Sequence, residues 1–177
     1  MSVLIRKAVS QDAEILLDIY RPYVENTAIS FEYKAPDIHE FRCRMDNLIE
    51  KYPYIAAEEQ GQIVGYAYSS AFNERQAYAR SVETTIYIRQ DCRGMGYGSK
   101  LYTALEKMLQ EQNFLNMYAC IAYTDREDEY LTNASMRFHE SMGFKTVGHF
   151  HSCGYKFGRW YDMLWMEKFI GEHKVVV

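Results

Sequence analysis

The densest group of residues able to bind a ligand lies between residues 86 and 100. An apolar segment, Ile86-Tyr87-Ile88, leads into Arg93-Gly94-Met95-Gly96-Tyr97-Gly98, and a helical pattern follows from about residue 99. Glycine tolerates positive φ and lets a ligand approach main-chain N–H groups. The first N–H groups of a helix have no partner inside it. The segment therefore predicts a phosphate-binding turn at a helix N-terminus, to which Arg93 and Lys100 add positive charge.

Residue order decides between three glycine patterns. The dinucleotide-binding pattern G-x-G-x-x-G requires a third glycine where Ser99 stands. The phosphate loop G-x-x-x-x-G-K-S/T requires Lys directly after Gly, whereas the chain reads Gly98-Ser99-Lys100. The pattern R/Q-x-x-G-x-G/A fits residues 93–98. A glycine-rich turn without a ligand is the remaining alternative.

Glu83 and His139 are the two candidates for proton transfer. Glu83 precedes the strand that leads into the glycines. Its carboxylate accepts a proton near pH 7 only if burial raises its pKa above the ordinary value of about 4.3. His139 lies in a short helical pattern over residues 133–142, and imidazole acts as acid or base near neutral pH. A solvated Glu at a strand end and a structural His are the simpler alternatives.

The segment His149-x-His151-x-Cys153 contains three side chains of the metal-binding type. Strand alternation would place all three on one face. Three ligands so close on one strand rarely surround zinc tetrahedrally, and the usual paired-ligand spacing is absent. We therefore expect no metal here, and instead sheet packing or a wall of the substrate site.

Hydrophobic periodicity predicts the elements that must position these residues. Ser10 offers an N-cap for a first helix, and Pro36 suits the start of a second. Strands are expected over residues 3–8, 54–59, 63–69, 82–88 and 115–122, helices over 99–112 and 133–142, and two further strands within 144–169. The order β-α-α-β-β-β-α-β-α-β-β, without a Pro/Gly/Ser linker, predicts one mixed α+β domain over residues 1–177.

Composition narrows the classes of partner. A chain of 177 residues with 48% apolar residues can build one core, and its net charge of -4 argues against nucleic-acid binding through bulk charge. The sequence contains no apolar run of about 18 residues and no signal-peptide pattern at its start. We therefore expect no membrane span, a cytoplasmic location and four free cysteine thiols.

Four segments in the same order resemble the GNAT N-acetyltransferases, and within them the phosphinothricin acetyltransferase group. They are Val82-Glu83-Thr84-Thr85-Ile86-Tyr87, Leu101-Tyr102-Thr103, Phe138-His139-Glu140-Ser141-Met142-Gly143-Phe144 and Gly154-Tyr155-Lys156-Phe157-Gly158-Arg159-Trp160. The resemblance implies an acyl-CoA N-acyltransferase fold with a central, mixed, twisted sheet and about four flanking helices. It also implies acetyl-CoA as cosubstrate, direct attack of a neutral amine on the thioester, and a homodimer.

The resemblance also implies which residues bind the cofactor and move protons. Main-chain groups of the strand hold pantetheine and polarise the thioester, the glycine loop holds the pyrophosphate, and the start of the last helix contributes further contacts. Glu83 matches the proposed base, and His139 occupies the position where this group has His. The cofactor set is Thr85, Ile86, Tyr87, Ile88, Arg93, Gly94, Met95, Gly96, Tyr97, Gly98, Ser99, Thr132, Asn133 and Ser135. Helix capping is the alternative role for Thr132 and Asn133.

Acceptor binding is implied for Phe31, Arg75 and Tyr78. Arg75 would bind a carboxylate through two hydrogen bonds, which fits an amino-acid-like amine. The chain departs from the group at three positions, Arg80, Phe157 and Tyr161, so the resemblance does not name the acceptor. The acidic segment 125–130 would disfavour a polyanion and suit a cation. A polyamine, an aminoglycoside or a protein N-terminus stays an alternative acceptor, and a non-catalytic acetyl-CoA-binding module stays an alternative function.

Overall fold

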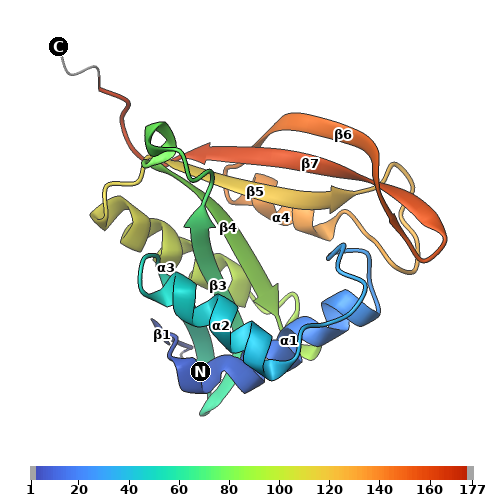
Figure 1. Cartoon of the computed structure of the whole chain (residues 1–177), viewed down its shortest axis with the longest axis horizontal. Helices are drawn as coiled ribbons and strands as arrows, with labels where there is room; N and C mark the ends of the chain where they lie inside the picture. Colours follow the sequence, from blue (N-terminus) through green and yellow to red (C-terminus); the bar gives the residue numbers. More distant parts are fainter. Residues whose placement is uncertain (1–2, 175–177) are drawn as a thin grey trace.

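The computed structural model describes residues 3–174, which form one seven-stranded sheet flanked by four α-helices (Figure 1). The strands are β1 (Leu4–Lys7), β2 (Tyr54–Glu59), β3 (Gln62–Ala71), β4 (Ser81–Ile88), β5 (Asn116–Tyr123), β6 (Lys145–Lys156) and β7 (Arg159–Phe169). The helices are α1 (Ala13–Glu25), α2 (Ile38–Ile49), α3 (Tyr97–Glu111) and α4 (Ala134–Ser141). The order of elements and the mixed α/β class confirm the prediction.

The sheet has the strand order β1-β2-β3-β4-β5-β7-β6. Neighbouring strands are antiparallel, except that β4 and β5 run parallel. The parallel pairing covers only residues 81–83 of β4 and 116–118 of β5. Beyond Glu83 the two strands diverge, so the rest of β4 has no strand partner on that side within the described residues.

The helices cover both faces of the sheet, with α1 and α2 on one face and α3 on the other (Figure 1). Alternate strand residues feed the two cores, because successive side chains of a strand point to opposite faces. The α1–α2 core contains Leu16, Leu17, Ile19, Phe41, Met45, Tyr54 and Tyr66. The α3 core contains Ile55, Val64, Val82, Leu101, Leu105, Leu109 and Met117, and α4 packs against it through Met136, Phe138 and Met142.

The first helix begins later than its predicted cap. Ser10 lies in a 3-10 turn (Ser10–Asp12), and α1 starts at Ala13. The Asp12 carboxylate holds this turn by pairing with Arg6, six residues earlier on β1, at 2.7 Å and by accepting a hydrogen bond from the Val9 N–H at 2.9 Å. The second helix begins at Ile38, where the side chain of Asp37 accepts a hydrogen bond from a main-chain N–H of the first turn.

Among the described residues, no helix combines the length and the apolar character needed to span a bilayer.

Candidate active site

Two cavities meet where β4 and β5 diverge. The larger, of about 410 Å³, lies between the glycine loop, α1 and α4, and the smaller, of about 220 Å³, lies beside residues 83–87 of β4. Three residues line both cavities, namely Ile29, Ile86 and Ser135. The space at the end of the glycine loop therefore adjoins the space beside Glu83.

The main-chain groups of β4 alternate between β3 and the gap that faces β5. At one end of the pairing, the Ser81 carbonyl accepts a hydrogen bond from the N–H of Phe72 at 3.4 Å. At the other end, the N–H of Arg89 donates to the Val64 carbonyl at 2.8 Å. In an antiparallel pair the two main-chain groups of one residue point to the same side. The odd-numbered residues of this segment therefore bond β3.

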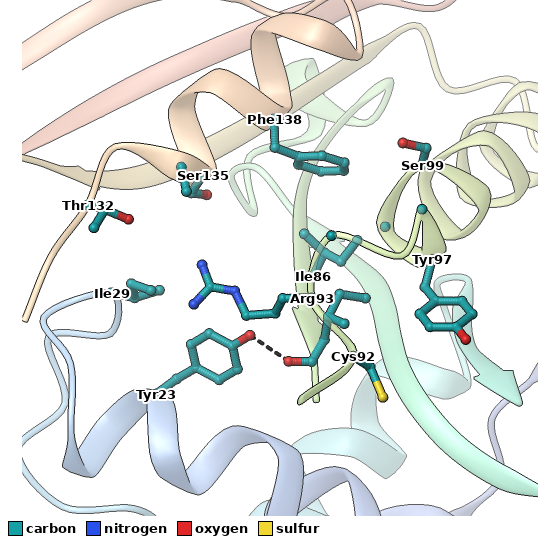
Figure 2. A pocket seen from close by; sticks show the side chains of 15 residues that line it. Tyr23, Ile29, Ile86, Cys92, Arg93, Tyr97, Ser99, Thr132, Ser135 and Phe138 are labelled. Carbon is teal, nitrogen blue, oxygen red and sulfur yellow. Dashed lines mark hydrogen bonds between the residues drawn. The ribbon is translucent and has the colours of Figure 1, made fainter. Parts of the chain in front are cut away.

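Ile86 and Ile88 consequently present their N–H and C=O groups to the gap. The Ile88 carbonyl confirms this direction, because it accepts a hydrogen bond from the Tyr23 hydroxyl at 2.5 Å (Figure 2). The main chain of Thr85 and Tyr87 points to β3 instead, so of the four residues predicted to bind pantetheine only Ile86 and Ile88 offer main-chain groups to the gap. Thr85 and Tyr87 line the smaller cavity.

The glycine loop forms the wall at the start of α3. Gly94 and Gly96 have φ of 77° and 82°, a region that residues with a Cβ rarely adopt. A Cβ built on either would meet no atom within 4 Å, so the backbone conformation, rather than crowding, requires glycine there. Gly96 is the N-cap of α3, and the unpaired N–H groups of the first turn follow it. The loop thus presents main-chain donors to the larger cavity.

Gly98 is required for a different reason. A Cβ at this position would lie 3.1 Å from the ring of Phe138, so the absence of a side chain lets α4 approach α3. The neighbouring Tyr97 is buried, and its hydroxyl donates to Glu59 on β2. Tyr97 therefore contributes its main chain rather than its hydroxyl to the cavity wall.

Figure 2 shows the Arg93 guanidinium directed into the larger cavity, with Thr132 and Ser135 on the opposite wall. The Arg93 guanidinium is therefore placed where it could pair with a phosphate. Ser99 lines the same cavity near the start of α3 (Figure 2). These polar groups and the apolar Ile86 and Phe138 face one elongated space.

Two residues predicted to bind the cofactor line neither cavity. Met95 is 58% exposed and lies at the outer side of the loop. Asn133 precedes α4, and its side chain donates to the Thr124 carbonyl at 2.8 Å and accepts from the Thr124 N–H at 3.3 Å. Asn133 thus ties the start of α4 to the end of β5, and Thr132, one residue earlier, is the one that reaches the cavity.

Glu83 lies at the wall of the smaller cavity, at the last residue where β4 pairs with β5. Its side chain is partly buried, and this burial raises the pKa of the carboxyl above its usual value. Tyr68 and Cys120 line the same cavity. A carboxylate of raised pKa that faces a cavity beside free main-chain donors can accept a proton from an incoming group.

His139 is almost completely buried on α4 and also borders the smaller cavity. Its Nδ1 lies 2.7 Å from the Ser135 carbonyl, which can only accept, so Nδ1 carries the proton. Its Nε2 therefore accepts the Tyr102 hydroxyl at 2.8 Å. Burial lowers the pKa of His139 to about 4. The imidazole is neutral near pH 7, with both nitrogens engaged.

The predicted acceptor residues lie apart. Phe31 packs so closely on Gly154 that a Cβ there would overlap its ring. Arg75 and Tyr78 belong to the β3–β4 connection, where Tyr78 contacts the ring of Phe72 at a centroid distance of 5.7 Å. In Figure 1 this connection lies near the C-terminal end of β7, whereas the α1–α2 connection that carries Phe31 lies near the other end. None of the three lines either cavity.

The three positions that differ from the phosphinothricin acetyltransferase group have contacts of their own. Arg80 donates to the Asn113 carbonyl at 2.9 Å, and Phe157 stacks on Tyr130 at 4.2 Å. Tyr161 is buried and donates to Asp128 at 3.0 Å. These side chains pack the fold rather than face the cavities.

Lys156 is a functional candidate that local sequence patterns do not reveal. Its side chain is buried, and Nζ donates to the carbonyls of Val24, Thr27 and Ser30 at 2.6, 2.8 and 2.6 Å. It thereby joins the end of β6 to the loop after α1, which carries the cavity residue Ile29. The only signal for it lay in the Gly154–Trp160 resemblance, which says nothing of its contacts.

Comparison with known proteins agrees with this geometry. The family model described as Acetyltransferase (GNAT) domain matches residues 5–165. Phosphinothricin N-acetyltransferase of Streptomyces coelicolor is 36% identical over 170 residues, or 94% of this chain and 95% of that one. Phosphinothricin N-acetyltransferase of Streptomyces viridochromogenes is 32% identical over 168 residues, or 94% of this chain and 88% of that one.

Solved structures agree as well. The crystal structure of a GNAT superfamily phosphinothricin acetyltransferase from Sinorhizobium meliloti in complex with AcCoA has a TM-score of 0.87 to this chain at 33% identity, covering 97% of this chain and 90% of that one. The predicted fold and the predicted cosubstrate, acetyl-CoA, are thereby confirmed. The chain belongs to the GNAT family of acetyl-CoA-dependent N-acetyltransferases and is similar to its phosphinothricin acetyltransferases.

Proposed function

We propose that the chain transfers the acetyl group of acetyl-CoA to the primary amine of a small amino-acid-like acceptor resembling phosphinothricin or methionine sulfoximine. One observation carries the proposal. The cavity bordered by Glu83 adjoins the cavity of the glycine loop at Ile86, where β4 has no strand partner on the side of β5. The relatives that share this chain over 94% of its length act on phosphinothricin by name, which supports the acceptor class.

The cofactor is proposed to lie along the larger cavity. Its pyrophosphate would accept hydrogen bonds from the N–H groups that follow Gly94 and Gly96, with the Arg93 guanidinium as counter-charge. Its pantetheine arm would pair with the main chain of Ile86 and Ile88, as an added strand does at a sheet edge. This placement brings the thioester to the junction with the smaller cavity.

The reaction proposed at that junction is direct transfer. The amine nitrogen attacks the thioester carbonyl carbon, and the charge on the carbonyl oxygen is stabilised by a main-chain N–H of β4. Glu83 accepts the proton that the nitrogen gives up, the C–S bond breaks, and the thiolate leaves with the electron pair and takes up one proton from solvent water. His139 is neutral, and we assign it the positioning of Tyr102 through Nε2 rather than proton supply.

The contacts of the acidic segment weaken the case for a polycationic acceptor. Arg159 pairs with Asp128 at 2.7 Å and with Glu129 at 2.9 Å. Arg137 pairs with Glu127 at 2.7 Å. Three carboxylates of the segment thus already have cationic partners, which leaves little unpaired negative charge there to attract a polyamine or an aminoglycoside.

A panel of acceptors tests the proposal. Thiol release from acetyl-CoA would be measured with L-phosphinothricin, L-methionine sulfoximine, a polyamine, an aminoglycoside and a peptide with a free N-terminal alanine. The matched control is the decarboxylated amine of each amino acid. We expect the amino acids to have the highest kcat/KM, and the decarboxylated amines to lose at least about tenfold, because a site that binds a carboxylate is left unpaired without it.

Each other outcome contradicts a stated part of the proposal. Preference for the polyamine, the aminoglycoside or the peptide overturns the acceptor class and leaves acetyl transfer in place. Binding of acetyl-CoA with turnover of no acceptor would favour the non-catalytic binding module instead.

Three further predictions rest on family likeness and composition. We propose a homodimer, supported by large exposed side chains on the β6–β7 hairpin, among them Phe150, Tyr155 and Trp160. Light scattering during gel filtration tests it, with Trp160→Glu expected to shift the mass to that of a monomer.

We also propose one folding unit over residues 1–177, which a single cooperative unfolding transition would test. The third proposal is a cytoplasmic location.

A further inference from the structure

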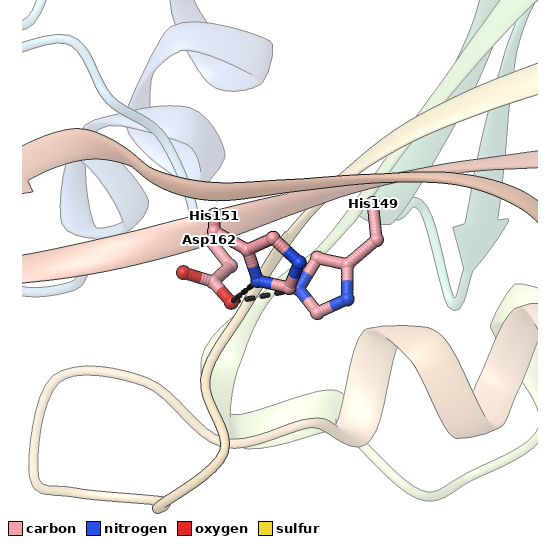
Figure 3. A group of neighbouring side chains, drawn as sticks. All are labelled: His149, His151 and Asp162. Atoms are coloured by element: carbon pink, nitrogen blue, oxygen red, sulfur yellow. Dashed lines mark hydrogen bonds and ion pairs between the residues drawn. The ribbon is translucent and has the colours of Figure 1, made fainter.

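His149, His151 and Asp162 lie together on the β6–β7 hairpin, outside the two cavities (Figure 3). His149 Nε2 is 2.7 Å from Asp162 Oδ2, and His151 Nδ1 is 3.4 Å from the same oxygen. One potential ligand atom from each residue lies within 4.8 Å of the other two. Figure 3 shows both imidazoles and the carboxylate directed toward one another beneath the strands.

A β-bulge in β6 produces this grouping. The register with β7 breaks between Phe150 and Gly154, and Ser152 has φ of 48°, so regular alternation does not continue through the segment. The third member is consequently Asp162 on β7, not Cys153. The expectation that His149, His151 and Cys153 share one face is therefore wrong. The argument against a metal from three ligands on one strand does not apply to ligands on two strands.

The carboxylate is held in place independently of the imidazoles. Asp162 Oδ1 accepts a hydrogen bond from the main-chain N–H of Ser152 at 2.6 Å, which leaves Oδ2 facing the two rings. The ring of Tyr123 packs edge-on against His149 at 5.3 Å. Groups around a metal ligand that fix its orientation in this way strengthen binding.

We propose that His149 Nε2, His151 Nδ1 and Asp162 Oδ2 form a binding site for one divalent transition-metal ion, Zn²⁺ in the first instance. Tetrahedral ligands about 2.1 Å from zinc lie about 3.4 Å apart. The His151–Asp162 separation of 3.4 Å matches that value, and the His149–Asp162 separation of 2.7 Å is a hydrogen bond that must lengthen when the ion binds. The two imidazole nitrogens must approach each other, which His151 can achieve by side-chain rotation because it is 74% exposed.

The chemistry of the three ligands selects the ion. Imidazole and carboxylate together suit Zn²⁺, Ni²⁺ and Cu²⁺, whereas Mg²⁺ and Ca²⁺ prefer oxygen ligands alone. Water would complete the coordination, since both imidazoles are accessible from solvent. The ion would clamp the bulge of β6 to β7 and takes no part in acetyl transfer, because none of the three residues lines the cavities at the gap.

Calorimetric titration of the chelator-treated full chain with ZnCl₂ tests the site. We expect one ion per chain, and we expect His149→Ala and His151→Ala each to weaken binding at least about tenfold, since each removes a ligand. His39→Ala is the matched control, because His39 is exposed on α2 far from the hairpin in sequence. Unchanged binding in both hairpin variants, or an equal loss in His39→Ala, overturns the site. One ion per two chains overturns a site made by a single chain.

Cysteine thiols are the competing zinc ligands, and Co²⁺ distinguishes them. The chain has four free cysteines, and Cys153 belongs to the same bulge. We expect the Co²⁺ complex to lack a thiolate-to-cobalt charge-transfer band, and Cys153→Ser to bind Zn²⁺ like the parent chain. A thiolate band that disappears in Cys153→Ser overturns the proposed ligand set.

Asp162→Asn provides a variant that keeps the bulge. Its amide oxygen can still accept the Ser152 N–H, while the anionic ligand is lost. A ligand that binds only the folded state raises the unfolding temperature, so Zn²⁺ should raise the Tm of the parent chain and leave that of Asp162→Asn unchanged. An equal rise in Asp162→Asn, or no rise in the parent chain, contradicts the clamp.

Discussion

The two sides of the gap between β4 and β5 are built differently. On one side, β4 and the glycine loop present main-chain groups from a short, continuous stretch of sequence that ends at Ser99. On the other, the loop after α1 is held by the side chain of Lys156, more than 120 residues away in the chain. The first side, called the cofactor side below, depends on backbone conformation. The second side, called the acceptor side because it carries the predicted acceptor residue Phe31, depends on long-range side-chain contacts.

This difference predicts how each side responds to substitution. Main-chain donors survive most side-chain changes, so the cofactor side tolerates truncation except where a glycine conformation is required. The acceptor side loses its position when one buried polar group is removed, because unpaired carbonyls in the interior are costly. Glu83 lies at the wall of the smaller cavity, and the role proposed for it is proton transfer rather than binding.

The largest effect is expected for Glu83→Gln. The amide keeps the size of the side chain and removes the proton acceptor, so kcat should fall by about 10²- to 10⁴-fold. Acetyl-CoA affinity, measured by calorimetry, should stay within about twofold, since the groups proposed to bind it are elsewhere. Glu74→Gln, on the exposed β3–β4 connection, is the control. Unchanged turnover in Glu83→Gln removes the carboxylate from the mechanism.

Lys156→Met is expected to have the next largest effect. It leaves the carbonyls of Val24, Thr27 and Ser30 without their donor, and we expect the free energy of unfolding to fall by roughly 4 kcal/mol. In the fraction of the variant protein that remains folded, KM for the acceptor should rise more than KM for acetyl-CoA. Urea denaturation and steady-state kinetics measure the two effects.

Lys145→Met, on the exposed start of the same strand, is the control for that comparison. A parallel rise in both KM values would show that the loop after α1 does not belong to the acceptor side in particular. The comparison between the two walls would then fail.

The fold and the cofactor side were predictable from the sequence to a degree that the acceptor side was not. Strand, glycine turn and helix follow local rules, and these brought Arg93 and Ile86 to one cavity. The resemblance assigned both Thr132 and Asn133 to the cofactor, but the side chain of Asn133 bonds the main chain of Thr124 instead of lining the cavity. Local rules did not reveal the separation of Phe31 from Arg75, because the α1–α2 and β3–β4 connections that carry them lie near opposite ends of β7 (Figure 1).

His139 predicts a pH dependence of stability. Its pKa is about 4 in the folded chain and 6.5 when exposed, so between these values the unfolded state binds more protons. Stability is therefore fully present above about pH 6.5 and declines by on the order of 3 kcal/mol as the pH falls to about 4.

Unfolding free energies of parent and variant across this range check the dependence. The decline attributable to this residue should disappear in His139→Gln and persist in His173→Gln, which changes an exposed histidine near the C-terminus. Identical pH profiles for the parent and His139→Gln would mean that the imidazole is not held neutral by burial.

The smallest effect concerns the glycine loop itself. Gly96→Ala forces a Cβ into a backbone with φ of 82° where no neighbouring atom is within 4 Å, so the cost is conformational alone, about 1 kcal/mol. If the loop relaxes to avoid that cost, its N–H groups turn away and KM for acetyl-CoA rises several-fold while KM for the acceptor stays. Met95→Ala, one residue earlier on the exposed side of the loop, should change neither constant. An equal effect of the two substitutions would mean that side chains, not the backbone, hold the cofactor on this wall.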